Sequence, residues 1–462
     1  MAGLRHSLKR GASLSTSLTS LGYRARILSA GGVYPQFNNP KIATIGDSLI
    51  AHGVDGASPG TTNAWATNAG ELVLAQQLHQ RFRHDNWPYN TATMTPANDR
   101  YTTGANQAIS GSDIYSHRTM LVNYLLPLNP DIIVYRPSIN GTAGVGTGAA
   151  NAAYFLETCD MIRAAGKYLI LGPMIPWVND PSNTYNDQAH LDNRAVINAA
   201  VRAYAATMPK SQGLFVDYDT VMDPTGTGWT ARSNMSDFIH LGTQGGLMCA
   251  RLLNQALDLI IPPRNYAKEL WDAGNNKFPY PILAGNGGVT ANGTGSTPTG
   301  MRTQRGGTGS STLVLSTEAN AETGGLTRVF TITGVGTGAT AYYELFVGTT
   351  GDFTVTGQTG QWVRSIAEIE VMGNDALLLP QLWSNGRRAL YDNGWSGNIG
   401  DAQQQTYWLV TDAAQVGSDT ANLRIRLYPN ADRAIAAGGA PMVAKVKRLG
   451  YYFVSNPQTA WA

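Results

Sequence analysis

The sequence has little cysteine, little charge and no long apolar stretch. Its 462 residues include two cysteines, Cys159 and Cys249, so no disulfide framework stabilises the fold, and the cellular compartment stays open. Charged side chains make up 14% of the chain, and 33 basic against 31 acidic residues leave a net charge of +2. Such a balance gives no general attraction to nucleic acid or membranes. No run of about eighteen apolar residues occurs, so no transmembrane helix and no membrane insertion are expected.

Metal-ligand spacing is absent as well, because no group of His, Cys and carboxylate residues is arranged like a metal site. The sequence therefore implies neither a metal nor another cofactor. Glycine, in contrast, is abundant, with 52 residues. Much glycine and little charge indicate many turns and an uncharged polar surface, which argues against a long-helix or coiled-coil architecture. The length predicts two or three domains.

Residues 1–37 carry basic side chains but no unbroken apolar core of about seven residues, so they make a poor signal peptide. Two interpretations stay open for this stretch. It is either a short amphipathic attachment segment, or a disordered leader. The apolar positions of the first interpretation are Leu18, Leu21, Ile27 and Leu28.

Residues 38–262 alternate short apolar runs with longer helical patterns. Strands are expected at 41–46, 130–140, 167–175 and 213–219, and helices at 71–82, 152–166, 193–208 and 244–261. Strands that alternate with helices of this length predict a parallel sheet covered on both faces. We therefore expect a doubly wound, three-layer α/β domain.

After Pro262 the helical period disappears. Residues 263–312 are predicted to be a junction with Gly/Thr-rich loops, and the tract 284–312 is either a linker or the first loops of the next domain. Alternating strands are expected at 327–335, 341–349, 362–371, 406–411, 422–429 and 443–453. Separated by Gly, Asn and Asp turns, they predict an all-β sandwich or jelly roll over 313–462.

Chemistry is first suggested by Ser48, which follows an apolar run in the motif "GDSL". Such a stretch is either an ordinary turn or a nucleophile at the carboxyl end of a strand. A serine nucleophile needs a base and an orienting group. Asp237 and His240, in "SDFIHLGTQGG", follow the last expected strand through a loop and should project from the same sheet edge as Ser48. Helix capping is the plainer interpretation of this pair.

Together, "IGDSL" and "DFIHL" resemble the SGNH/GDSL hydrolase family of esterases and lipases. The resemblance covers roughly residues 38–262 and implies a flavodoxin-like fold with Ser48 as nucleophile, His240 as base and Asp237 as its partner. Two further blocks are expected to complete an oxyanion hole. "NQAISGSD" has Ala108 where the family has glycine, and "PSINGT" has Ser138 for Gly and Gly141 for Asp but keeps Asn140. The resemblance thus implies three donors: the backbone N–H groups of Ser48 and Ala108, and Nδ2 of Asn140.

Other candidates are less sharply defined. Arg136 either contacts an anionic substrate or pairs with a carboxylate in the core. Substrate-lining roles are also considered for Asp47, Trp65 and Trp177. The remaining histidines considered, His52, His117 and His190, are expected to be surface, lining or structural residues, the last two in polar loops.

The residues around the site favour a small, polar substrate. The inserts 51–70 and 177–193 are rich in Asn, Asp and Thr with a few aromatic rings, a mixture suited to sugar recognition. The aromatic residues of the second half are either stacking platforms for sugars or core residues; they are Trp362, Trp383, Tyr391, Trp395 and Trp408. We therefore expect a carboxylic ester hydrolase that removes short acyl groups, such as acetyl, from a polysaccharide or other glycan of a cell surface or capsule.

Three interpretations of the whole chain follow. Its Gly/Thr/Asn-rich style resembles phage tail-fibre or tailspike esterases, which implies an extracellular or virion-associated location, attachment to a virion through the N-terminal segment, or a homo-oligomer. The second is a secreted acetylxylan-type esterase with a binding module. The third is a virion or adhesin protein that binds glycans without hydrolysing them, in which the departures at Ala108, Ser138 and Gly141 mark lost chemistry.

Overall fold

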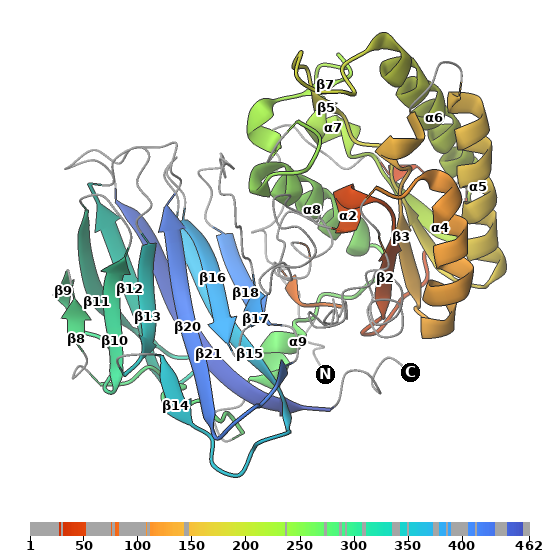
Figure 1. The fold of residues 1–462 in the computed structure, drawn as a ribbon. Coiled ribbons are helices and arrows are strands. Elements are labelled where there is room, and N and C mark those ends of the chain that lie inside the picture. The colour runs from red at the N-terminus through yellow and green to blue at the C-terminus, as the bar shows by residue number, and fades with distance from the viewer. Residues whose placement is uncertain are drawn as a thin grey trace, which may run out of the picture.

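The fold is described from a computed structural model. It describes residues 27–28, 31–51, 75, 79–82, 108, 111–142, 147–235, 238–271, 275–285, 289–291, 293–306, 311–334, 342–348, 351–372, 378–384, 387–389, 405–411, 414–429 and 441–455. Figure 1 shows two parts, an α/β part and an all-β part, with the short helix α9 (Tyr266–Leu270) between them.

Among the residues described, the α/β part is built on four parallel strands in the order β2 (Ile42–Ile45), β3 (Ile132–Tyr135), β4 (Tyr168–Leu171) and β6 (Gly213–Val216). Every residue of these strands is buried, as expected for a parallel sheet with both faces covered. The predicted parallel sheet is confirmed, with strands shorter than their apolar runs.

A fifth strand lies at the edge beyond β6. β1 (Ile27–Leu28) pairs antiparallel with β6, Ile27 opposite Val216 and Leu28 opposite Phe215. Further along, the Phe37 N–H donates to the carbonyl of Ile260 at 2.7 Å. From residue 27 on, the N-terminal segment therefore belongs to the α/β part, which corrects the expected boundary at residue 37. The attachment segment was expected over residues 1–37, of which 1–26, 29 and 30 lie outside the described residues. Two of its four expected apolar positions, Ile27 and Leu28, pair with β6 instead.

Helices cover both faces of this sheet. Figure 1 shows α4 (Ile114–Met120), α5 (Gly148–Ala164) and α6 (Gln188–Thr207) on one side of the strands and α8 (Thr243–Leu257) on the other. α4 continues through a π-helical turn, Leu121–Leu125, and a 3-10 turn, Leu126–Leu128. Of the helix expected at 71–82, only Ala75 and His79 are described as helical. The three-layer arrangement agrees with the prediction.

The predicted helices start later in the sequence than the observed ones. α6 begins five residues before its expected start because Asp187 caps it, its Oδ1 accepting from the His190 N–H at 2.8 Å.

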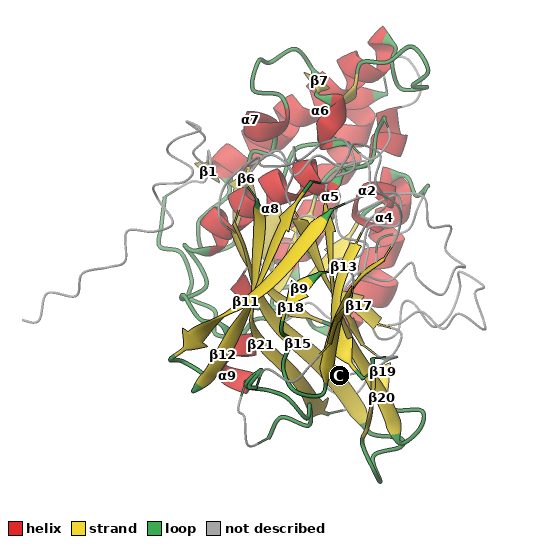
Figure 2. Cartoon of the chain, turned by 90° about the vertical axis from the view of Figure 1, so that its left-hand side faces the viewer, coloured by secondary structure: helices red, strands yellow, loops and turns green. Residues whose placement is uncertain are grey.

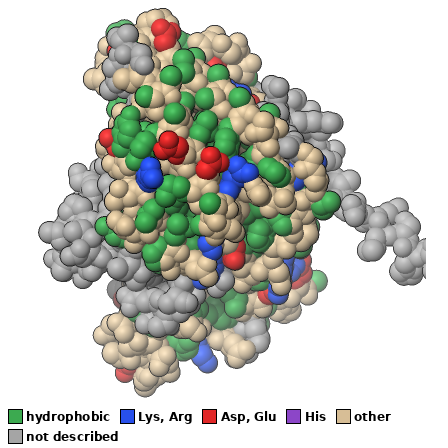
Figure 3. Space-filling view, turned by 90° about the vertical axis from the view of Figure 1, so that its right-hand side faces the viewer, with side chains coloured by type: hydrophobic (Ala, Val, Ile, Leu, Met, Phe, Trp, Pro, Cys, Tyr) green, Lys and Arg blue, Asp and Glu red, His purple; other side chains and the backbone are tan. Residues whose placement is uncertain are grey.

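The outer helical face mixes charges of both signs (Figure 3), with Arg118 3.5 Å from Glu157 and Arg163 3.3 Å from Asp160. None of the described helices is long and apolar enough to cross a membrane.

Shorter elements fill the connections. They are α2 (Ser48–Ala51), the 3-10 turn Ile139–Thr142, β5 (Trp177–Val178) paired with β7 (Trp229–Thr230), α7 (Asp219–Met222) and the 3-10 turn Arg232–Asn234.

The described residues of the all-β part form two seven-stranded sheets, seen below the helices in Figure 2. The first runs β17 (Arg387–Ala389), β16 (Leu378–Ser384), β20 (Thr420–Pro429), β13 (Tyr342–Val347), β10 (Met301–Gly306), β8 (Val289–Ala291), with β14 (Asp352–Thr354) beside β20. The second runs β18 (Gln405–Val410), β15 (Trp362–Met372), β21 (Met442–Val454), β12 (Gly325–Thr333), β11 (Thr312–Asn320), β9 (Thr294–Gly295), with β19 (Ala414–Gln415) beside β15.

Eight of these strands follow the order of a jelly roll. One sheet contains β12, β21, β15 and β18 side by side, and the other contains β13, β20, β16 and β17. Inward side chains from both sheets share one core, among them Phe330, Leu345, Ile369 and Ile425.

The Gly/Thr-rich tract belongs to these sheets. All six residues of β10 pair with β13, Met301 opposite Val347, and Met301 is buried. The tract 284–312 also supplies β8 and β9. It is therefore neither a linker nor only loops, and the boundary expected at 313 is corrected to lie before β8.

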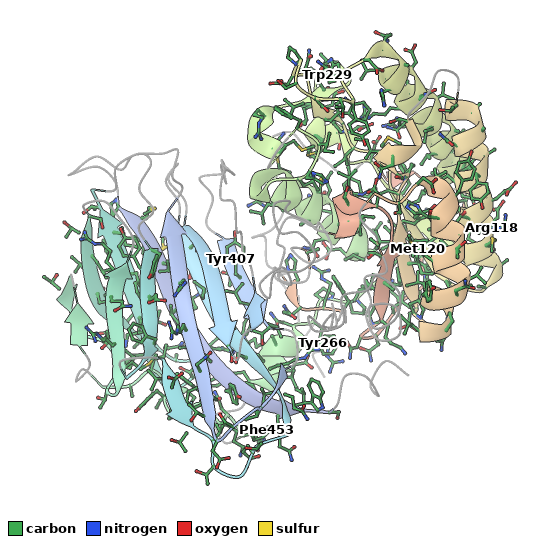
Figure 4. All side chains as sticks on the ribbon, in the orientation of Figure 1. Arg118, Met120, Trp229, Tyr266, Tyr407 and Phe453 are labelled. Carbon is green, nitrogen blue, oxygen red and sulfur yellow. The ribbon has the colours of Figure 1, made fainter. Side chains whose placement is uncertain are left out.

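Helix α9 joins the two parts. Ala267 is buried against Ile366, Trp408 and Tyr452 on the second sheet, and Figure 4 labels Tyr266, the first residue of α9, between the two parts. Nε2 of Gln80 donates to the Trp408 carbonyl at 2.8 Å. Trp408 is therefore part of the contact between the two parts, which corrects its candidacy as a sugar-stacking platform.

Candidate active site

Ser48 lies where strand β2 ends and helix α2 begins. The chain turns at Gly46, where a Cβ would lie 2.6 Å from Cδ1 of Ile50, so the tight turn favours a residue without a side chain. Ser48 is 7% exposed at the carboxyl end of a central strand. This is the place where open α/β sheets bind their ligands, as the motif predicted.

Asp47 faces the protein rather than a substrate. Its Oδ1 accepts from the Leu49 N–H at 3.0 Å, and its Oδ2 accepts from Ser138 Oγ and from the Ile139 N–H, both at 2.9 Å. The carboxylate is buried. The prediction that Asp47 lines the substrate site is therefore wrong: it ties the Ser48 turn to the segment that carries Asn140.

Ser112 is a residue that the sequence analysis missed. Its Oγ donates to the Gly46 carbonyl at 3.0 Å, and its own carbonyl accepts from Ser138 Oγ at 2.9 Å and from Asn140 Nδ2 at 3.0 Å. One buried serine thus joins three segments that are far apart in the sequence. It lies inside the motif "NQAISGSD", in which the sequence analysis singled out Ala108 and not Ser112.

Asn140 presents an amide that is only partly used. Its Nδ2 donates one hydrogen to the Ser112 carbonyl, and its Oδ1 accepts from the hydroxyl of Tyr185 at 2.9 Å. Among the described residues, the second hydrogen of Nδ2 has no acceptor. A half-buried amide with a spare N–H next to the Ser48 turn has the donor capacity that an oxyanion hole requires.

Ser138 also takes part in this cluster. Its hydroxyl contacts Asp47 and the Ser112 carbonyl, and it accepts from the Asn140 N–H at 3.1 Å. A glycine, which the family motif has at this position, would leave these contacts unmade. Ala108 is completely buried, and its role as a donor stays a prediction.

His240 is carried by a loop that is fixed at both ends. Met235 and Leu241 form an antiparallel bridge, and the Gly242 N–H donates to the Asn234 carbonyl at 2.9 Å. His240 itself is 7% exposed. Asp237 lies outside the described residues, so the triad of Ser48, His240 and Asp237 stays a prediction.

His117 is buried within α4, not in a loop as expected. Its Nε2 lies 3.3 Å from Ser112 Oγ and its Nδ1 lies 3.2 Å from Tyr135 Oη. Ser112 Oγ gives its hydrogen to Gly46, so it accepts from Nε2–H, and Nδ1 then accepts from Tyr135. Burial lowers the pKa of His117 to about 4, against the attraction of the Asp47 and Asp113 carboxylates. The imidazole is therefore neutral near neutral pH and acts as a structural residue, as predicted.

Of the other histidines, His190 is in the first turn of α6 with Nδ1 2.7 Å from Asp187 Oδ1. His52 lies outside the described residues.

The predicted lining residue of the insert 177–193 is buried instead. Trp177 has no exposed surface and packs with its ring centre 6.2 Å from that of Tyr185 and 6.3 Å from that of Trp229. A ring without exposed surface cannot stack on a sugar, so this prediction is wrong. Trp65, the other tryptophan predicted to line the site, lies outside the described residues.

Arg136 is 2% exposed. Its Nη2 donates to the Leu49 carbonyl at 3.1 Å, and its guanidinium lies 5.9 Å from the ring centre of Tyr218. It therefore supports the backbone next to Ser48 from inside the protein, and the prediction of a substrate contact is corrected. The described part of the chain holds no cluster of three His, Cys, Asp or Glu side chains that could bind a metal.

Comparisons with known proteins find weak similarity to several solved structures of hydrolases. No family model matches the chain, and no curated protein matches it. A GDSL-like lipase of Bacteroides thetaiotaomicron is 15% identical, with a TM-score of 0.34 over 48% of this chain and 88% of that one. An acetylxylan esterase of Geobacillus stearothermophilus is 13% identical, with a TM-score of 0.33 over 48% and 97%. LAE5, an alpha/beta hydrolase from the metagenome of Lake Arreo, Spain, is 19% identical, with a TM-score of 0.32 over 50% and 99%.

Each of these matches covers about half of this chain. At these TM-scores the likeness carries no argument about activity, which has to come from the side chains described above.

Proposed function

We propose that this protein is a serine esterase. The observation that carries the proposal is the spare N–H of Asn140, held beside the Ser48 turn by Ser112 and Asp47. A serine at the carboxyl end of a parallel strand, next to a fixed amide donor, is the arrangement that acyl transfer needs.

The reaction follows from the chemistry of these groups. Ser48 Oγ attacks the ester carbonyl while His240 accepts the serine proton, and the carbonyl oxygen becomes an oxyanion that accepts from Asn140 Nδ2 and the N–H groups of Ser48 and Ala108. Collapse releases the alcohol, which takes the proton from His240. Water then attacks the acyl-enzyme with His240 as base, and the acid and free Ser48 are formed.

A short acyl group on a carbohydrate is the substrate class we propose. The described insert 177–193 exposes mainly polar side chains, and its exposed residues are Asn179, Pro181, Ser182, Thr184, Asp187, Gln188 and Asp192. An apolar cover for a lipid chain is not built from such residues. The aromatic rings Trp177 and Tyr185, in contrast, no longer support sugar stacking, because they serve the core and Asn140.

One experiment tests both the esterase activity and the proposed substrate class. The purified chain is assayed on p-nitrophenyl esters from acetyl to dodecanoyl and, in parallel, for release of acetate from a panel of acetylated polysaccharides. Hydrolysis that is fastest on acetyl esters, with acetate released from at least one polysaccharide, is the expected result. Fastest hydrolysis of long acyl chains contradicts the substrate class. Glycan binding without any ester hydrolysis contradicts the enzyme and favours a glycan-binding protein.

A further inference from the structure

Tyr185 contacts a proposed catalytic residue but has no role in the proposed reaction. Its hydroxyl lies 2.9 Å from Oδ1 of Asn140, although the two residues are 45 positions apart in the sequence. We infer that Tyr185 is a positioning residue, which fixes the Asn140 amide so that its spare N–H meets the oxyanion. This inference rests on the proposed function.

The two partners of Asn140 determine which way its amide faces. The Ser112 carbonyl can only accept, so the NH₂ end of Asn140 must face it, 3.0 Å away. Oδ1 then faces the Tyr185 hydroxyl, which must be the donor. Held at both ends, the amide cannot rotate about its terminal bond, which is otherwise a soft torsion. Without Tyr185, one hydrogen bond would hold one end only.

Tyr185 is itself held firmly. Its N–H donates to Asn183 Oδ1 at 3.1 Å, and Nδ2 of this buried asparagine donates to the Val178 carbonyl at 3.1 Å. The Tyr185 ring contacts two others: its centre lies 6.2 Å from that of Trp177 and 5.1 Å, edge-on, from that of His190. The segment between β5 and α6 thus presents one hydroxyl to Asn140 in a fixed place.

The phenol stays a donor in the pH range where the enzyme would work. Burial, and the negative charge of Asp47, raise the pKa of Tyr185 above its ordinary value. A deprotonated phenolate could only accept, and it would repel both Asn140 Oδ1 and a developing oxyanion. The surroundings of Tyr185 therefore favour the protonation state that its role needs.

The test is a double-mutant cycle on Tyr185→Phe and Asn140→Ala in the full-length chain, with kcat and KM measured on p-nitrophenyl acetate. Asn140→Ala should lower kcat by about 10²–10³-fold, as for loss of an oxyanion donor. Tyr185→Phe should lower kcat by up to about tenfold, the size of one hydrogen bond, with KM unchanged. The double variant should match Asn140→Ala within about twofold, because without the amide there is nothing for Tyr185 to position.

Tyr204→Phe is the matched control. Tyr204, in the C-terminal half of α6, is also half-buried as a residue, and its hydroxyl donates to a side-chain oxygen, Asp160 Oδ1 at 2.7 Å. It should leave kcat unchanged.

The outcomes distinguish failure of the positioning role of Tyr185 from failure of the proposed esterase function. If Asn140→Ala is damaging and Tyr185→Phe is silent, the inference fails and the esterase stands. If the two losses multiply in the double variant, Tyr185 acts independently of Asn140 and the positioning role is overturned. If Asn140→Ala is silent while Ser48→Ala abolishes activity, the amide is not the donor and the inference falls with it.

Discussion

Ser112 illustrates how much of this site depends on a residue that takes no part in the reaction. Its hydroxyl donates a hydrogen bond to the Gly46 carbonyl, and its own carbonyl accepts hydrogen bonds from the Ser138 hydroxyl and the Asn140 amide. Buried polar groups of this kind are costly unless every partner is present. At the residue scale, the Ser48 turn is therefore held by a buried hydrogen-bond cluster, and His117 contacts this cluster through the hydroxyl of Ser112.

Replacing the nucleophile is the first test at this scale. Ser48→Ala should lower hydrolysis of p-nitrophenyl acetate by about 10³-fold or more while the protein stays folded, because alanine fits the space of serine. Ser182→Ala is the matched control, since Ser182 is an exposed serine in the loop before α6. Circular dichroism checks the fold of both variants. A Ser48→Ala protein that keeps a tenth of the activity would remove Ser48 from the mechanism.

His117 predicts a pH dependence of stability. Its pKa is about 4 in the folded protein and 6.5 when unfolded, so between these values the unfolded chain binds the proton more tightly. Stability is therefore full above about pH 6.5 and is lost as the pH falls toward about 4, by roughly 3 kcal/mol.

Urea unfolding of the wild type and of His117→Gln, near pH 4 and near pH 7, measures this effect. The free energy of unfolding should fall less with pH in the variant, because glutamine does not titrate. His79, whose pKa burial also lowers to about 4, is present in both proteins and cancels in the comparison. Equal acid sensitivity of the two proteins would show that His117 is already charged or solvated in the fold.

At the scale of elements, a strand or helix could be predicted where its residues form a clear pattern in the sequence, and not elsewhere. β2, β3, β4 and β6 were predictable because buried parallel strands are continuous apolar runs. β1 could not be predicted, since two residues are too few to show an alternating pattern. β8, β9 and β10 could not be predicted either, because their Gly and Thr residues are equally typical of turns. Trp177 was misassigned for a related reason: composition shows that a loop contains a ring, not which way the ring faces.

The loop that carries His240 provides the test at this scale. It packs on the first turn of α8, where a Cβ at Gly245 would lie 2.3 Å from the Asn234 carbonyl oxygen. Gly245→Ala should therefore displace this loop, because the clash is with backbone, and lower kcat on p-nitrophenyl acetate by about tenfold or more. Gly417→Ala, where nothing lies within 4 Å, is the control and should be neutral. Unchanged kcat in Gly245→Ala would mean that the loop's position does not matter for catalysis.

At the scale of the whole molecule, the two parts are docked and not tethered. Besides the contacts of α9, Nε2 of Gln80 in the α/β part donates to the Trp408 carbonyl. The segment after α9 also packs on the second sheet: the Lys277 N–H donates to the Tyr451 carbonyl at 2.8 Å, and the guanidinium of Arg448 lies 5.2 Å from the ring centre of Trp271. Ser48, Asn140 and His240 all precede this junction in the sequence. The all-β part is therefore held at a fixed position beside a site to which it supplies none of the proposed catalytic residues.

Undocking the two parts tests what the second part contributes. Ala267→Asp would bury a carboxylate against Ile366 and Trp408, which costs several kcal/mol unless the surfaces separate. We expect separate melting transitions for the two parts, an unchanged kcat on p-nitrophenyl acetate, and slower release of acetate from a polysaccharide. Ala203→Asp, on an exposed position of α6, controls for the added charge. A lower kcat on the small ester would instead show that the all-β part shapes the active site, and an unchanged rate on polymer would leave it a role in assembly or attachment.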